Sequence, residues 1–423
     1  MGSIPPCNLA IIRPRSTCAA FNLPGAASDS FRDRSMLKGL LRLAPVAALL
    51  LMLCSTAHAE DGRRVFTGTL GKMPIVLELN TSNAENISGR YFYQKYRKDL
   101  VLSGIKNGEM LVLDEGEQRY GEKTPRPQIH LNIEPNRFWG DWSNDEGKTL
   151  KIELVEAKLP VMPAGTLPYL AKLHETEPYE YLRLQGMKLK QGKTETFNGY
   201  SLQWWSEPQT KTTLFEVVSG YTVEERQRIN QQLMGRLWLE VVGYYGCLAG
   251  GGVNFYHQTI KPLLMTPSVI SVNIGTEYSC GGAYPDQNDV PLNLDAKTGK
   301  PLVLEDILWV GEGKPLHYEE LYGESDQSPD TFTAFSAYRS NECAPWLVAQ
   351  LSKLYPDQMT SDEDCAYSDV EPWRFLSWHF AENGIKLEPS FPHVAASCGY
   401  VEWSVLPYNL IKQHPGGVAL QLP

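Results

Sequence analysis

The side chains that could carry out chemistry in this chain are scattered, and none of them completes a catalytic signature. His174 and Glu175 are adjacent, but no second histidine follows at the spacing that a zinc-protease helix requires. Ser103 and Lys106 have the spacing of an acylating serine and its lysine, but an Asn-Gly turn follows where a helix should begin. The sequence therefore names no catalytic residue, and an enzymatic role is not favoured.

Possible metal ligands give an equally weak pattern. Asp286, Asn288 and Asp289 supply oxygen atoms close to one turn, but calcium takes about six to eight such ligands, so a simple Asx turn is favoured. His257, His379 and His393 are far apart in the sequence, and each is expected to be structural or on the surface. We expect no metal and no cofactor. Hydrolysis by two carboxylates that meet only in the folded chain stays open.

Composition restricts the classes of partner. The chain has 423 residues and a net charge of −10, and an acidic protein is poorly suited to nucleic acid because phosphates require a basic face. The same charge would suit a cationic partner. The length suggests two or three domains, and 21 Tyr and 10 Trp favour β structure.

The N-terminal region has the pattern of an export signal. Basic residues after Met36, an apolar run over 44–53 and a small-x-small site ending at Ala59 form that pattern. We expect residues 1–35 to be an extra leader, Met36 to be the start, and 60–423 to be the mature chain. The apolar run is shorter than the roughly 20 residues of a membrane span. The sequence thus predicts a periplasmic or secreted protein with no transmembrane segment in the mature chain.

Five cysteines remain after such a cleavage, namely Cys247, Cys280, Cys343, Cys365 and Cys398. An oxidising compartment favours two disulfides and one leftover thiol. We prefer the pairs Cys343–Cys365, which would close a polar loop, and Cys247–Cys280, which would tie a helix end to a strand end. Sequence cannot prove connectivity, and Cys398 could displace either partner.

The predicted fold is α+β and mostly β, with two parts. Residues 60–156 contain about eight short alternating runs, which predict an antiparallel barrel or sandwich. Its interior is either filled or open to a ligand, and a filled core is favoured. Gly89-Arg90-Tyr91 and Gly140-Asp141-Trp142 suggest bulges or barrel corners. Residues 157–175, with Pro160, Pro163 and Gly165, are expected to form a linker.

Residues 176–423 are predicted to form an α+β domain with one long helix packed on an antiparallel sheet. Thr222 and Glu225 form a capping box, and the apolar residues Ile229, Leu233, Leu237 and Val241 recur on one face after it. Strands are expected at 179–184, 200–205, 270–274 and 290–294, in the hairpin around Asn383-Gly384, and at 401–405. A second helix is expected after Pro345.

Residues 210–412 resemble a domain of extracytoplasmic bacterial proteins, and ordered motifs carry the resemblance. The first two are Arg228-Ile229-Asn230 and the Gly-Gly-aromatic-Pro turn within 278–285. The next are the strand and Thr-Gly turn at 292–299, with the segment 304–308 that closes this unit. The last is the hairpin with the small-residue segment at 380–399. The domain is the outer part of a lysozyme-sensing anti-sigma factor and an accessory domain of PdaC-type peptidoglycan deacetylases. This chain differs by an insertion at about 315–370 and has no recognisable deacetylase domain, so neither signalling nor catalysis is supported.

The resemblance implies a non-catalytic recognition module facing the envelope. Its ligand would be cell-wall material, such as peptidoglycan fragments, or a cationic protein such as lysozyme. The expected binding residues are those of the turn: Tyr278, Gly281, Gly282, Tyr284 and Pro285. The alternative is an envelope hydrolase or cell-wall-modifying enzyme. Clustered carboxylates or histidines with perturbed pKa values would favour the enzyme, and an exposed aromatic patch would favour binding.

Overall fold

The computed structural model describes residues 62–423 except 117–123, 250–253, 282–283, 321–324 and 361–364. The predicted signal segment Met36–Ala59 lies outside the described residues. Within them the chain is mostly β with a smaller share of helix, as the α+β prediction requires. No helix in this described part is both long and apolar enough to cross a membrane.

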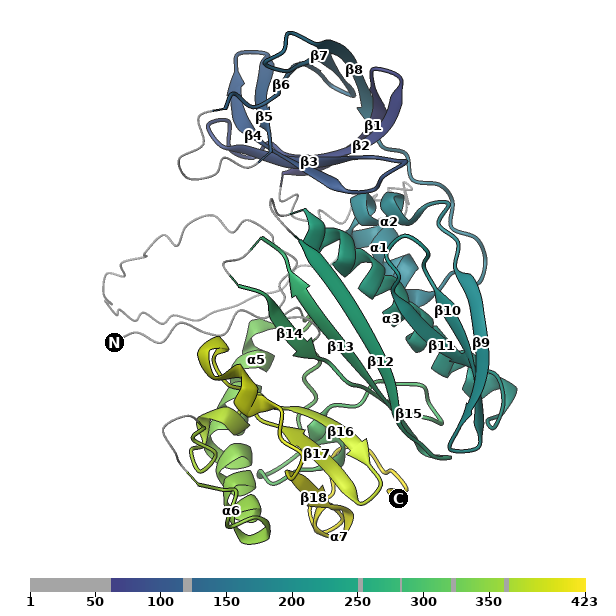
Figure 1. Ribbon diagram of the computed structural model, residues 1–423, viewed down its shortest axis with the longest axis vertical. Coiled ribbons are helices and arrows are strands. Elements are labelled where there is room, and N and C mark those ends of the chain that lie inside the picture. Colours follow the sequence, from purple (N-terminus) through teal and green to yellow (C-terminus); the bar gives the residue numbers. More distant parts are fainter. Residues whose placement is uncertain (1–61, 117–123, 250–253, 282–283, 321–324, 361–364) are drawn as a thin grey trace, which may run out of the picture. The chain divides into compact units, whose positions relative to one another are not determined.

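The first part is a closed antiparallel barrel in which each strand pairs with the next and the last returns to the first (Figure 1). Its strands are β1 (Arg63–Leu70), β2 (Met73–Asn80), β3 (Ile87–Tyr93), β4 (Asp99–Asn107), β5 (Met110–Glu115), β6 (Gln128–Glu134), β7 (Arg137–Ser143) and β8 (Thr149–Glu156). Alternate residues of each strand point inward, so Phe66, Leu77 and Leu131 join a fully buried apolar core. The predicted strands and the prediction of a barrel are therefore confirmed.

Glycine allows the barrel strands to bend. A Cβ at Gly140 would lie 1.8 Å from the carbonyl oxygen of His130, and one at Gly68 would lie 1.9 Å from that of Glu153. The neighbouring strand passes too close for any side chain at these positions. The Gly-x-aromatic motif at Gly140 thus marks a tight corner of the barrel, as its sequence indicated.

Two short helices follow the barrel, α1 (Pro168–Thr176) and α2 (Pro178–Leu184). The expected strand at 179–184 is wrong, because this segment is α2. Tyr179 packs toward Phe92 of the barrel, while Tyr181 and Leu184 pack in the cluster that contains Tyr245 of the long helix. A helix buried on two sides has apolar residues around its circumference, and these imitate the alternation of a strand.

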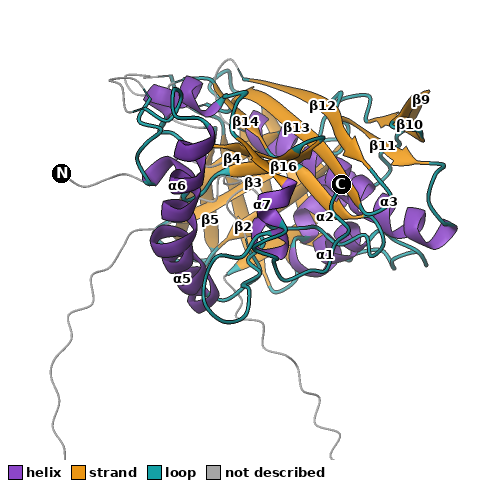
Figure 2. Ribbon diagram, turned by 90° about the horizontal axis from the view of Figure 1, so that it is seen from below, coloured by secondary structure: helices purple, strands orange, loops and turns teal. Residues whose placement is uncertain are grey.

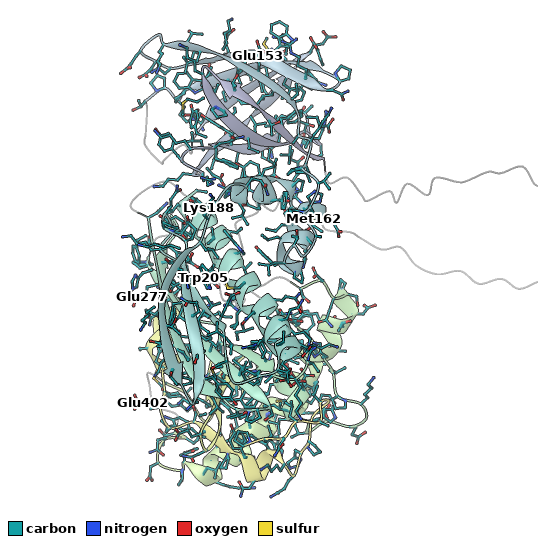
Figure 3. The ribbon with its side chains drawn as sticks, turned by 90° about the vertical axis from the view of Figure 1, so that its right-hand side faces the viewer. Glu153, Met162, Lys188, Trp205, Glu277 and Glu402 are labelled. Carbon is teal, nitrogen blue, oxygen red and sulfur yellow. A yellow bond between two sulfur atoms is a disulfide. The ribbon has the colours of Figure 1, made fainter. Side chains whose placement is uncertain are left out.

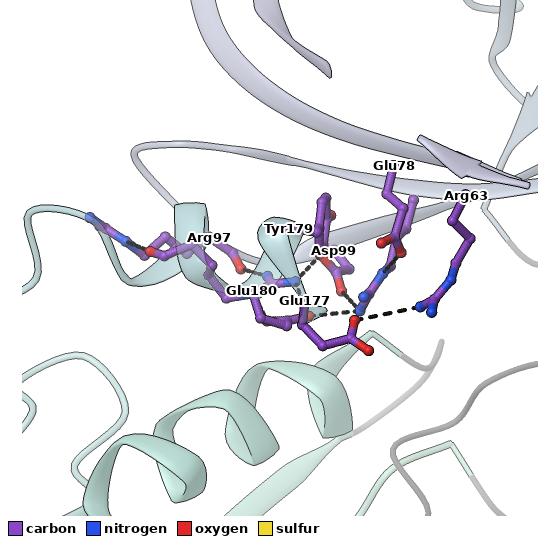
Figure 4. Close-up of polar contacts among 9 residues, drawn as sticks. Arg63, Glu78, Arg97, Asp99, Glu177, Tyr179 and Glu180 are labelled. Atoms are coloured by element: carbon purple, nitrogen blue, oxygen red, sulfur yellow. Dashed lines mark hydrogen bonds and ion pairs between the residues drawn. The ribbon is translucent and has the colours of Figure 1, made fainter. Parts of the chain in front are cut away.

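A network of buried charges fixes α2 to the barrel (Figure 4). Arg183 has no exposed side-chain surface and bonds Asp99 of β4 at 2.7 Å and Glu180 at 2.7 Å. Arg90 of β3 bonds Glu180 at 2.9 Å, and the Tyr179 hydroxyl donates to Asp99 at 2.7 Å. Burial opposes ionisation of Glu180, but the Arg183 and Arg90 guanidiniums outweigh it and lower the pKa of this carboxyl.

Helix α3 (Val223–Leu248) is the long helix that the sequence predicts. Thr222 and Glu225 form the expected capping box, and the stripe from Ile229 to Val241 is fully buried. The stripe packs on β11 (Thr213–Val217), β10 (Tyr200–Ser206) and β13 (Val269–Ser279). Strand β9 (Lys190–Phe197) lies on the outer side of β10, whose Trp205 is labelled in Figure 3.

The second sheet is organised around β13, which pairs with β12 (Phe255–Met265), β14 (Asp286–Asp289) and β15 (Leu292–Asp295). Ile270, Val272 and Ile274 face α3, as their alternation predicts. Ser271 faces the other way, and its hydroxyl accepts from the backbone N–H of Phe380. The back of β13 thus contacts the C-terminal strands.

The C-terminal strands β16 (Ser377–Ala381), β17 (Gly384–Glu388) and β18 (Val405–Pro407) form a third sheet. The hairpin at Asn383-Gly384 is confirmed. The expected strand at 401–405 is mostly wrong, because pairing begins only at Val405. Short helical segments complete this part: α4 (Leu304–Ile307), η2 (Glu371–Trp373), η3 (His393–Gly399) and α7 (Tyr408–Ile411).

The predicted insertion contains α5 (Pro329–Tyr338), η1 (Arg339–Cys343) and α6 (Ala344–Leu354), which follow one another in Figure 2. The helix predicted at Pro345 is α6. Proline has no backbone N–H for the helical hydrogen bonds, so it is tolerated at the start of α6. The π turn η1 directly precedes α6. Leu347 and Leu351 then enter the largest core cluster.

The disulfides correct one of the two expected pairs. Cys247 of α3 bonds Cys280 after β13, as predicted. Cys365 bonds Cys398 instead of Cys343, so the predicted Cys343–Cys365 pair is wrong. Cys343 is a free thiol with no exposed surface because the π turn directs it into the core. Cys343 lies at the end of a helical turn and not in the polar loop that the predicted pair would have closed.

Candidate functional site

The predicted binding turn starts at the end of β13 and contains Cys280 of the Cys247–Cys280 bond. The Tyr278 hydroxyl donates to Asp286 Oδ2 at 3.3 Å, Gly281 has a φ of +88°, and Tyr284 is 72% exposed. Pro285 leads into β14 and is exposed. Gly282 lies outside the described residues. The structure therefore brings Tyr278, Tyr284 and Asp286 to one end of the sheet.

A second segment, which the sequence analysis did not assign to the binding surface, meets this turn. The His393 ring stacks on Tyr284 with centroids 5.9 Å apart, and its Nδ1 lies 3.7 Å from Asp286 Oδ1. Val394 beside it is 96% exposed, and Tyr400 is 45% exposed. We call Tyr278, Tyr284, His393, Val394 and Tyr400 the aromatic rim. No local pattern joins 278–284 to 393–400, since their contact arises from the fold.

Polar residues of the C-terminal hairpin adjoin the rim. Ser377 pairs across the strands with Glu388, and His379 pairs with Lys386. Cross-strand partners share a face, so all four lie opposite the apolar Trp378 and Phe380. His379 Nδ1 lies 3.9 Å from Glu388 Oε1, and the Ser377 hydroxyl donates to the Asp289 carbonyl at 3.3 Å. The hairpin thus faces β14.

Residues of strands β12, β13 and β14 lie across from these polar hairpin residues. Asn273 Nδ2 donates to Asp289 Oδ1 at 3.0 Å. A Cβ at Gly275 would lie 2.6 Å from that same oxygen and 2.7 Å from the Thr259 hydroxyl. Glycine at this position lets the Asp289 carboxylate lie over the sheet. We call Asn273, Asp289, His379 and Glu388 the polar cluster.

Burial shifts the protonation equilibria of the hairpin residues. Burial is the main cause that raises the pKa of Glu388 to about 7, and the negative charge of Asp289 is the second cause. Burial and the charges of Lys386 and Lys261 lower the pKa of His379 to about 4. Burial also lowers the pKa of Lys386 to about 8, although Glu388 and Glu402 act in the opposite direction. Glu402 and Glu277 of β13 are labelled in Figure 3.

Other residues considered from the sequence have structural surroundings. His174 contacts the Pro160 carbonyl and packs against Tyr181. Ser103 pairs with Asp114 in the middle of a barrel ladder, away from any helix start. Asp286 and Asp289 belong to strand β14 rather than to an Asx turn. Within the described ranges no group of three or more His, Cys, Asp or Glu side chains could hold a metal ion.

The barrel interior has a polar contact at Glu115. The Tyr91 hydroxyl and the Trp142 indole N–H both donate to Glu115 Oε2, at 2.5 and 2.8 Å. Burial and Glu115 together raise the pKa of Tyr91. Glu115 is thus bonded by the barrel's own side chains, beside the buried apolar core. That the interior is filled stays a prediction.

A comparison with protein-family models found none that matches this chain. A comparison with curated proteins found no similar sequence.

Proposed function

We propose that this protein is an exported, non-catalytic recognition module of the cell envelope and that the aromatic rim is its binding surface. The observation that carries the proposal is the exposure of Tyr284, Val394 and Tyr400 next to the carboxylates of Asp286, Asp289 and Glu388. Exposed aromatic side chains gathered at one place are typical of binding surfaces. The export pattern and the two disulfides support an extracytoplasmic location.

The partner that fits best is a cationic protein of the lysozyme type. Carboxylates beside tyrosine rings attract lysine and arginine by charge and by cation–π contact. The net charge of −10 adds long-range attraction for such a partner. Peptidoglycan fragments are the second partner class, since aromatic rings and carboxylates also bind sugars and peptides.

The test is binding of c-type lysozyme and of peptidoglycan fragments to immobilised protein at low and at physiological salt. We expect Tyr284→Ala to weaken binding at least about tenfold, as for an interface hot spot. Tyr96→Ala is the matched control, because Tyr96 is an exposed barrel tyrosine at 54%. Binding that disappears at physiological salt would show only charge attraction, and equal binding by both variants would exclude the rim.

One observation favours a hydrolase as the second candidate. Glu388 and Asp289 are neighbouring carboxylates, and the pKa of Glu388 is raised to about 7, which suits a general acid. Release of soluble fragments from peptidoglycan, abolished by Glu388→Gln, would establish this activity. No release at high protein concentration would leave recognition as the role of the site.

A further inference from the structure

The polar cluster has acceptor atoms without partners. His379 Nδ1 and Asn273 Oδ1 are both shielded from solvent and have no hydrogen-bond partner among the described residues. The Asn273 amide nitrogen donates to the Asp289 carboxylate, and a carboxylate only accepts, so the unpartnered Asn273 atom is the oxygen. A buried acceptor without a hydrogen-bond partner is destabilising, and a ligand rich in N–H donors would supply the missing partners.

Every group that the cluster leaves available accepts hydrogen bonds. Neutral His379 accepts at Nδ1 when its proton is on Nε2, and Glu388 and Asp289 accept when they are ionised. The Glu388 side chain is 20% exposed and that of His379 is 14% exposed, so solvent reaches the outer part of the cluster, while His379 Nδ1 and Asn273 Oδ1 lie behind it. A group with several N–H donors and a positive charge matches this arrangement.

We propose that the polar cluster binds one ammonium or guanidinium group of a lysine or arginine side chain, and that Glu388 releases its proton when the cation binds. This inference rests on the proposed function, because it names the group that a partner would insert behind the aromatic rim. The carboxylates of Glu388 and Asp289 hold the charge, and the Asn273 carbonyl oxygen accepts an N–H.

Several charges face Glu388 and must be included. Ser377 and His379 come from β16 and Lys386 from β17; Asp289 comes from β14, and Tyr400 from the end of η3. Lys261 of β12 acts on His379. Lys386 opposes a bound cation, but its ammonium donates to the Val401 carbonyl and Glu402 lies near it. Asp286 adds negative charge at Tyr400.

Proton release gives the proposal a defined pH dependence. Glu388 is mostly protonated below pH 7, so a cation can bind there only as the proton leaves. The association constant should therefore rise as much as about tenfold per pH unit up to roughly pH 7. Above that pH only the loss of the opposing Lys386 charge, whose pKa is about 8, adds to the affinity. A fixed carboxylate pair that was always ionised would give no such rise.

The experiment titrates the full chain with the amides of Nα-acetyl-arginine and Nα-acetyl-lysine at millimolar concentrations between pH 5.5 and 8.5. Calorimetry in two buffers of different ionisation heat counts the protons released. The uncharged amide of Nα-acetyl-citrulline is the ligand control. We expect both cations to bind, citrulline to bind at least about tenfold more weakly, and close to one proton to be released at pH 6.

Two variants separate the role of Glu388 from folding. Glu388→Gln should weaken binding and remove the rise in affinity below pH 7, and Asp289→Asn should weaken binding and keep that rise. Glu382→Gln, at an exposed turn of the same hairpin, should match the parent. Thermal melting confirms that each variant is folded.

Three results would overturn the proposal: no heat with either cation, equal binding of citrulline, or an unchanged pH profile in Glu388→Gln. Each is independent of the lysozyme and peptidoglycan binding test. A partner could bind through the rim with no cation in the cluster, and small cations could bind although neither partner class does.

Discussion

Glu388 and His379 are expected to oppose each other in the pH dependence of folding. The folded-state pKa of Glu388 is about 7, above the 4.5 that is usual for a glutamate, so its contribution to stability is fully present below pH 4.5 and is lost as the pH rises toward 7. The folded-state pKa of His379 is about 4, below the 6.5 that is usual for a histidine, so its contribution is present above pH 6.5 and is lost as the pH falls toward 4. Between these limits the two slopes nearly cancel.

Single substitutions should reveal the two slopes. At about 1.4 kcal/mol per pKa unit, Glu388→Gln should raise the free energy of unfolding above pH 7 by as much as about 3 kcal/mol. It should also make stability rise with pH between 4.5 and 6.5, whereas His379→Gln should make it fall. Urea unfolding at pH 5, 6 and 8 measures both, with Glu382→Gln as the control. If the free energy of unfolding followed the same pH profile in the parent and in all three variants, the pKa shifts assigned to Glu388 and His379 would be contradicted.

The attachment of α2 to the barrel depends on buried ion pairs, above all those of Arg183. Arg183→Met would leave Asp99 and Glu180 buried with only Arg90 as a guanidinium partner. Removal of one member of such a group costs about 3–5 kcal/mol, so the urea midpoint should fall strongly. Arg374→Met is the control, because Arg374 pairs with Glu371, which is 76% exposed, and such pairs contribute about 0–1 kcal/mol. If Arg183→Met lowered the free energy of unfolding by less than 1 kcal/mol, apolar packing alone would hold α2 against the barrel.

The elements also show which features the sequence can predict. The barrel strands, the Thr222 cap and the β13 alternation depend on residues close in the chain, and they were predicted. Helix α2 was mistaken for a strand because two different partners bury it. The electrostatic interaction of Glu388 with Asp289 joins residues about a hundred positions apart in the sequence, and the Tyr284–His393 stack is similarly remote. Of the described residues at the site, Tyr278, Gly281, Tyr284 and Pro285 were named as binding residues from the sequence, through the resemblance.

For the whole molecule, the two disulfides should contribute similarly because each joins residues 33 positions apart. The chain-entropy model gives about 4 kcal/mol for each loop. Cys247→Ala with Cys280→Ala, and Cys365→Ala with Cys398→Ala, should therefore lower the free energy of unfolding by similar amounts. Unequal losses would show that one bond also supports native packing.

Thiol labelling checks the connectivity itself. Burial raises the pKa of the Cys343 thiol, so Cys343 should resist alkylation in the native protein and react once denaturant is added. Peptide mass spectrometry without reduction should find Cys365 linked to Cys398. A Cys343–Cys365 peptide would contradict the structure.

The Cys247–Cys280 bond also has a consequence for how quickly a partner can be captured. It anchors the start of the Tyr278–Pro285 turn to the end of a helix whose apolar stripe is fully buried. A strand end that is held in this way loses little conformational entropy when it docks, so contact through Tyr278 should not wait for that part of the chain to fold. Reduction of this bond should then slow association before it changes the contacts of the final complex.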